Sequence, residues 1–176
     1  KIMTWYIRFD VFAGLLAGCG TILGREWTAA AHEYYSQQIL ERPNDIDAKY
    51  EERIYRARLL AVDMAVLFSK KAKDTIDEDD FAAQCDSLHD QFDAFEGEID
   101  PALRDPSKLV SSITGVAPQD PNDIASPCSG AMLFSGNLFP TNFVLIDFWA
   151  MDLMLRHHLL TVGRLSLAEV ASYVPK

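Results

Sequence analysis

Ionisable side chains stand inside otherwise apolar stretches of this sequence, and these are the positions where binding or catalysis is first sought. Three acids and three bases share this placement: Asp10, Asp63, Asp147, Arg8, Arg25 and Arg156. An unpaired charge is costly to bury, so each of them needs a partner. One interpretation is structural, with ion pairs that fix the register of packed helices. The other is functional, with a polar cluster that lines a cavity and binds a small ligand, or with a desolvated carboxylate that acts as a general acid or base.

Tryptophan residues extend the candidate ligand site. The ligand-binding hypothesis comprises seven residues: Arg8, Asp10, Arg25, Trp27, Asp63, Asp147 and Trp149. Trp27, Phe148 and Trp149 could form an aromatic wall of a pocket, although aromatic residues at helical spacing more often belong to a core. No nucleophile or phosphate-binding loop accompanies these residues, so we predict no catalytic residue and no enzymatic activity.

The histidines do not form a metal-binding pattern. His157 and His158 are adjacent, so both cannot reach one metal ion from a single face of a helix. His32 and Glu33 lack the spacing of an HExxH motif. We therefore predict neither a metal site nor a cofactor in this chain.

Composition predicts a packed domain in a reducing compartment. Hydrophobic residues make up 49% of the chain and aromatic residues 11%, which favours a globule over disorder. Cys19, Cys85 and Cys128 are scattered, without a CxxC motif, and are expected to be buried thiols. The chain has 176 residues, lacks an initiator methionine and has no recognisable signal peptide, so we expect one domain cut from a longer protein.

The net charge of −10 is unevenly distributed. Residues 74–106 hold twelve acids and a single base, Arg104, while the rest of the chain is nearly neutral. An acidic chain of this kind is repelled by a phosphate backbone. We therefore expect no direct contact between this chain and nucleic acid.

The opening helix is apolar on two opposed sides. At about 100° per residue, one side would carry Trp5, Phe9, Phe12 and Leu16, and the other Ile7, Val11 and Leu15. A helix of this type is expected to lie between two layers of the fold. Glycines at positions 14, 18, 20 and 24 are expected to end it.

The remaining periodicities predict an all-α, multi-helix domain. Further helices are expected at 28–40, 46–71, 77–99, 141–162 and 167–173. The third of these has a narrow apolar stripe at 4-3-4-3-4 spacing, made of Phe81, Cys85, Leu88, Phe92, Phe95 and Ile99. Proline, glycine and serine between about 107 and 140 predict a long irregular connection.

We expect helix 141–162 to be central, buried and packed beside the opening helix. Asp152 and Arg156 are four residues apart, in the order that favours an ion pair along a helix. The helix is long enough to resemble a membrane span, but Asp147 and these two charges would each be costly in lipid. We therefore expect no membrane insertion.

Several segments carry a resemblance to a known family. They are residues 8–15 (RFDVFAGL), 23–27 (LGREW), 59–65 (LLAVDMA), 100–106 (DPALRDP), 120–124 (DPNDI) and 142–149 (NFVLIDFW). These segments resemble the fungal-specific regulatory domain, or middle homology region, of zinc binuclear-cluster transcription factors. The resemblance spans nearly the whole chain, but none of its motifs is catalytic or metal-binding.

The resemblance implies a single helical regulatory domain over residues 1–176, acting in the nucleus. Such a domain controls a DNA-binding module elsewhere in the polypeptide, and zinc is expected only in that module. Homodimers, a coactivator or corepressor protein and a small-molecule effector are the implied partners. Two alternatives remain: a helical protein-interaction scaffold, to which the acidic helix could contribute a docking surface, and a helical enzyme with a buried carboxylate.

Overall fold

A computed structural model describes residues 2–17, 19–110 and 133–172, without the side chains of residues 2–5, 8, 15 and 170–172. Its α-helices are α1 Ile2–Ala17, α2 Arg25–Glu41, α3 Ile46–Ala72, α4 Glu78–Phe95, α5 Thr141–Thr161 and α6 Leu167–Ser172. Three short 3-10 turns accompany them: η1 Pro101–Leu103, η2 Pro106–Lys108 and η4 Gly136–Leu138. The predicted all-α fold class is confirmed, and the described ranges contain no β-strand beyond one isolated bridge.

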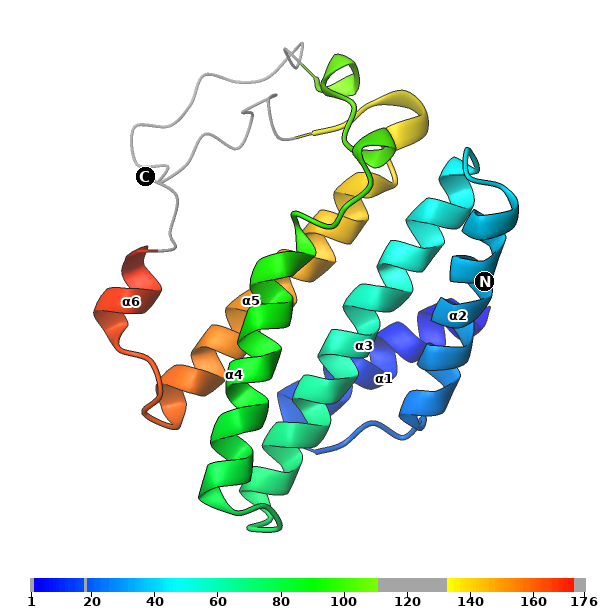
Figure 1. Cartoon of the computed structure of the whole chain (residues 1–176). Helices are drawn as coiled ribbons and strands as arrows, with labels where there is room; N and C mark the ends of the chain where they lie inside the picture. The colour runs from blue at the N-terminus through cyan, green and yellow to red at the C-terminus, as the bar shows by residue number, and fades with distance from the viewer. Residues whose placement is uncertain (1, 18, 111–132, 173–176) are drawn as a thin grey trace.

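The centre of the fold is α3, which contacts α1, α2, α4 and α5 (Figure 1). It begins at an N-cap aspartate, Asp45, whose side chain accepts a hydrogen bond from the Ala48 N–H at 3.0 Å. From Leu59 to Ser69 most side chains are buried, because this half of the helix is apolar on nearly every side. The central position that we expected for helix 141–162 therefore belongs to α3.

The apolar stripe of α4 faces inward as predicted. Asp77 caps the helix by accepting a hydrogen bond from the Asp80 N–H at 2.8 Å. All six stripe residues are buried: Phe81, Cys85, Leu88, Phe92, Phe95 and Ile99. The helix itself ends at Phe95, before the predicted end at residue 99, so Ile99 is buried from the turn that follows. A single narrow stripe leaves a helix only one way to face the core.

Aromatic rings join α4 to α5. The ring of Phe148 stacks against Phe95, with centroids 4.2 Å apart, and against Phe92 at 5.6 Å. Phe68 of α3 meets Phe81 of α4 edge to face at 5.7 Å. We call these contacts between α3, α4 and α5 the aromatic seam; stacked and edge-to-face rings stabilise such a joint beyond their buried area.

Helix α5 has the predicted bounds but is buried along only one face. Val144, Phe148 and Leu155 face inward, whereas Ile146 is about half exposed and Leu153 is 63% exposed. Among the described residues, Gly136–Thr161 is the one helical segment that is long and apolar enough to cross a bilayer, a property that core helices share. Here part of its surface packs on α3 and α4.

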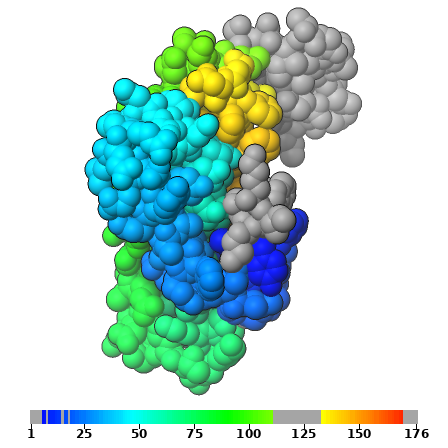
Figure 2. Space-filling model, turned by 90° about the vertical axis from the view of Figure 1, so that its right-hand side faces the viewer, coloured from blue at the N-terminus to red at the C-terminus, as the bar shows by residue number. Residues whose placement is uncertain are grey.

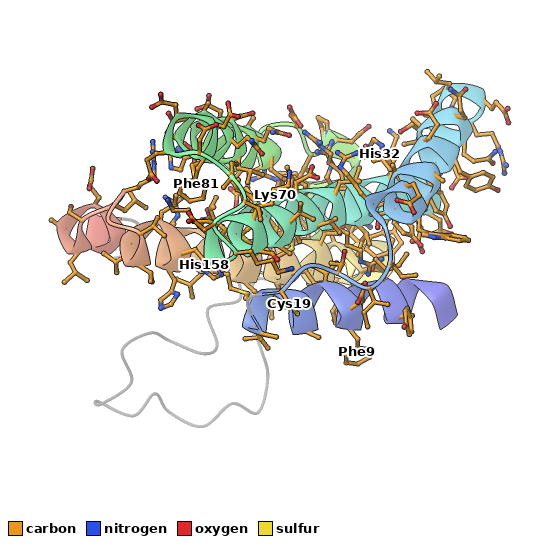
Figure 3. All side chains as sticks on the ribbon, turned by 90° about the horizontal axis from the view of Figure 1, so that it is seen from below. Phe9, Cys19, His32, Lys70, Phe81 and His158 are labelled. Atoms are coloured by element: carbon orange, nitrogen blue, oxygen red, sulfur yellow. The ribbon has the colours of Figure 1, made fainter. Side chains whose placement is uncertain are left out.

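Helix α1 lies on the surface, so the prediction that it sits between two layers is wrong for its described side chains. Ile7 and Val11 are buried, but Phe9 is 66% and Leu16 is 80% exposed. Figure 3 shows Phe9 projecting away from the other helices, and Figure 1 shows α1 crossing behind α3. The helix also continues through Gly14 to Ala17 instead of ending at its first glycine.

Helix α2 covers another side of α3. Tyr35 of α2 stacks against Tyr55 of α3, with ring centroids 5.7 Å apart. Figure 2 shows α2 in blue over this face, with the green hairpin between α3 and α4 below it. The α2 helix ends at Glu41, before Pro43, as predicted.

The segment predicted to be irregular, about 107–140, is described only at its two ends, and residues 111–132 lie outside the description. Two backbone hydrogen bonds of 2.8 Å join residues 108–110 to residues 133–135. The buried Asn142 side chain accepts from the Phe134 N–H at 2.8 Å and donates to its carbonyl at 2.9 Å. These contacts, which we call the clasp, hold the two ends together beside the start of α5.

The cysteines differ from one another. Cys85 is buried, as predicted, and burial raises the pKa of its thiol to about 11. Cys19 is exposed, so its predicted burial is wrong. It follows the end of α1. Cys128 lies outside the described residues.

Candidate functional site

A small pocket lies between α1, α3 and α5. Its lining comes from all three helices: Val11, Phe12, Ile54, Ala57, Arg58, Val144, Asp147 and Met151. The space between the lining atoms measures about 310 Å³ including open solvent at its mouth, and it leaves room for about one water molecule. A larger ligand would have to displace a helix to enter.

Two oppositely charged side chains, Arg58 and Asp147, line this otherwise apolar pocket. Arg58 is 7% and Asp147 is 9% exposed. The Arg58 guanidinium carbon lies 5.3 Å from the centroid of the Tyr55 ring, within cation–π range. A ligand group of either charge would therefore have an oppositely charged side chain within the pocket.

Asp10 is buried and tied to backbone rather than to a base. Its carboxylate oxygens accept hydrogen bonds from the N–H groups of Ile22 and Leu23, both at 2.8 Å. The expectation of an ion pair is therefore replaced by a tether between α1 and the turn that leads to α2. The same turn approaches α1 closely, since a Cβ at Gly14 would lie 3.0 Å from the Cys19 carbonyl oxygen.

Arg25 and Asp63 form one of the predicted ion pairs. The guanidinium donates from Nε at 2.6 Å and from Nη2 at 3.0 Å to the two carboxylate oxygens. The hydrogen bond raises the pKa of Arg25, while burial acts against it. The pair joins the start of α2 to α3, and the side chains remain 52% and 30% exposed, so it contributes little to stability.

The Arg156 side chain lies between α4 and α5 and does not line the pocket. Its Nε donates to Asp152 at 2.9 Å, which confirms the predicted pair along the helix. Its Nη2 also lies 3.5 Å from Asp93 of α4. Arg156 is buried, so this ionic contact forms part of the joint between the two helices.

The predicted aromatic wall does not form. Phe148 is buried in the aromatic seam, while Trp27 and Trp149 are both partly exposed and neither lines the pocket. The Trp149 indole N–H donates to Glu96 of α4 instead. Phe148 packs against α4, where it stacks on the rings of Phe92 and Phe95. The side chain of Arg8 lies outside the described residues.

Two polar features escaped the sequence analysis. Arg58 interrupts the apolar face on which Ile54 and Ala61 lie, and that interruption could have marked it. His32 of α2 lies 2.9 Å from Glu52 of α3, a contact that no local spacing signals. Burial acts to raise the pKa of Glu52, but the His32 hydrogen bond and the charge of Arg53 together lower it.

The described part of the chain contains no group of three His, Cys, Asp or Glu side chains that could hold a metal ion. No family model, curated protein or solved structure matches this chain. The resemblance to fungal regulatory domains stays a sequence-based prediction.

Proposed function

We propose that this chain is a regulatory domain that controls a DNA-binding module elsewhere in the same polypeptide. The observation that supports this best is the pocket beneath α1, where Arg58 and Asp147 lie at the meeting of three helices. A site at which one helix closes over two buried charges can couple ligand binding to helix movement.

The proposed movement is that of α1 relative to α3. Among the described side chains of α1, Ile7 and Val11 are the buried apolar ones. A small molecule with an apolar body and one charged group would match the lining. Its charge would compete for Arg58 or Asp147, and its body would need the room that α1 now occupies. Such a ligand binds the displaced arrangement better and shifts the population towards it.

The other parts of the proposal follow the sequence resemblance. The domain would act in the nucleus, as a monomer or homodimer and with a coactivator or corepressor, while zinc and the DNA contacts belong to the separate module. The net charge of −10 supports a role away from the phosphate backbone. We propose no catalytic activity: Asp10 and Asp63 are both occupied by hydrogen bonds from protein groups.

Thermal unfolding with three probes of equal chain length tests the ligand site. The probes are decanoate, decylamine and decanol, and we expect at least one charged probe to change the melting temperature more than decanol does. Asp147→Asn should abolish the response to the amine, and Arg58→Met the response to the carboxylate. Asp90→Asn, on the exposed side of α4, is the control and should respond as the wild type does. Equal responses to all three probes, or none, would overturn the ligand site.

A fusion of this chain to an unrelated DNA-binding domain tests regulation directly. We expect reporter transcription from the cognate site to differ from that of the DNA-binding domain alone. Asp147→Asn should alter that output if the pocket takes part. An unchanged reporter, with the fusion protein present at normal levels, would contradict the regulatory role.

A second function, protein interaction, is favoured by a separate observation. The outward side of α5 carries a row of large apolar side chains that no described helix covers.

A further inference from the structure

The outer α5 face is an apolar ridge formed by five exposed side chains: Phe139, Phe143, Ile146, Trp149 and Leu153. Phe139 lies in the turn before α5, and the spacing of the other four, at three, three and four residues, places them on one side of the helix. The ridge spans about 21 Å at 1.5 Å per residue. Single exposed apolar residues are ordinary, but a continuous row of this length is typical of an interaction surface.

An acidic edge borders this ridge. It consists of Asp86, Asp90, Asp93 and Glu96 on α4. Three contacts fix it beside α5 and the residues that follow: Trp149 donates to Glu96, Arg156 approaches Asp93 at 3.5 Å, and Arg164 donates to Asp86 at 3.0 Å. Arg104 also reaches this edge, where it donates to the Glu96 carbonyl at 2.9 Å. Four carboxylates against three guanidinium groups still leave the edge with a net negative charge.

We propose that the outer α5 face and this acidic edge together bind an amphipathic helix of a partner protein, with lysine or arginine along one flank of its apolar stripe. Such a helix can lay its apolar stripe along Phe143, Ile146 and Leu153 in the manner of groove-bound helices. Its basic flank then meets Asp90 and Glu96 across the edge of the interface, where complementary charge speeds association and fixes orientation.

Charge favours a basic partner helix over two other possible occupants of this face, a second copy of the chain and an anionic membrane. A second copy of this chain carries the same acidic edge and a net charge of −10, so a symmetric pairing would bring like charges together. An anionic membrane surface would repel the edge in the same way. The surface is also separate from the pocket, whose α5 wall consists of Val144, Asp147 and Met151. The inference therefore stands or falls independently of the proposed ligand site.

Binding of designed peptides tests the proposal. The probes are helical peptides of about 18 residues, a length that matches the ridge. One carries leucine at helical i, i+3, i+4 spacing with lysine elsewhere, the second replaces lysine by glutamate, and the third scrambles the lysine peptide so that no apolar face forms. Titration calorimetry on the whole chain is expected to show binding of the first peptide only, weakened as salt rises from about 50 to about 300 mM.

Variants of exposed residues locate the binding surface. Leu153→Ser should weaken binding of the lysine peptide by about tenfold, since a buried leucine is lost from the interface. Asp90→Asn should weaken it by about two- to threefold and reduce its salt dependence. Leu40→Ser, at an equally exposed leucine on α2, is the matched control and should leave binding unchanged.

Four results would overturn the proposal. Equal binding of the glutamate peptide would show that the acidic edge does not select a basic partner. Equal binding of the scrambled peptide would show that an apolar helix face is not needed. Light scattering that shows a dimer which Leu153→Ser dissociates would assign the face to a second copy of the chain. Binding to phosphatidylcholine vesicles, lost in Leu153→Ser, with no peptide binding would assign it to a membrane.

Discussion

The two sides of α3 are joined to their neighbours by different chemistry. Towards α4 and α5, phenylalanine rings such as Phe95 and Phe148 stack at 4.2 Å and fill the aromatic seam. Towards α1, the buried side chains are Ile7 and Val11, the pocket contains Arg58 and Asp147, and the Asp10 carboxylate ties α1 to the turn before α2. Apolar burial has no preferred direction and resists change, whereas a directional hydrogen bond can be exchanged for another. We therefore expect the α4 and α5 side of α3 to contribute most of the stability, and the α1 side to be the one that rearranges when a ligand binds.

Removal of a ring from the aromatic seam should have the largest effect. Phe95→Ala deletes a fully buried side chain, and we expect a loss of about 3–5 kcal/mol in the free energy of unfolding. Urea denaturation measures it. The control, Phe139→Ala on the exposed turn before α5, should change stability by less than about 1 kcal/mol. A Phe95→Ala loss as small as that of the control would mean that the seam does not dominate stability.

Loss of the Asp10 tether should have a smaller and local effect. Asp10→Ala leaves the N–H groups of Ile22 and Leu23 without their acceptor, at a cost of about 1–3 kcal/mol. Hydrogen exchange should accelerate at those two amides, while the amides of α4 and α5 keep their protection. Uniform acceleration throughout the helices would show that α1 and the aromatic seam unfold as one unit and would break the comparison.

The exposed ion pair on the α1 side should contribute still less. A double-mutant cycle with Arg25→Gln and Asp63→Asn is expected to give a coupling energy of about 0–1 kcal/mol, because solvent screens both charges. Thermal or urea unfolding of the four proteins provides the values. A coupling above about 2 kcal/mol would assign this pair a leading role in holding α2 against α3.

The smallest effect concerns pH at the far end of the aromatic seam, where His158 stacks on Phe68 at 4.5 Å. Burial, reinforced by the neighbouring His157, lowers the pKa of His158. The unfolded chain then binds the proton more readily, so stability should fall as pH drops below the ordinary histidine value of about 6.5. His158→Phe should reduce that fall between about pH 7.5 and 5.5, as measured by urea unfolding. His157→Gln, the control, should retain most of it; an equal reduction in both variants would contradict the assignment.

Helix positions followed from the sequence where one periodicity was dominant. The α4 stripe has a single apolar face, so its orientation could be predicted residue by residue. The pair between Asp152 and Arg156 was equally readable, because it lies within one helix. Local rules of this kind do not depend on the rest of the fold.

Orientation failed where a helix is apolar all round. Leu153 and Leu155 differ in nothing that the sequence displays, yet one is exposed and the other fully buried. The neighbours available in the fold decide which face turns inward. The hydrogen bonds of Asp10 could not be predicted for another reason. Their donors are backbone N–H groups, which every residue except proline possesses. The sequence named Arg25 and Asp63 among the charges that need partners, but it did not exclude other pairings among the three acids and three bases.

The clasp beside α5 has an evolutionary and practical consequence. Because residues 108–110 and 133–135 are bonded to each other, insertions or deletions between them need not disturb the helix packing. In general, each doubling of the length of chain between two bonded ends adds only about 0.6 kcal/mol of closure entropy. A fluorescent reporter spliced into this interval should thus leave the helical body intact, and sequence length can drift there at little thermodynamic expense.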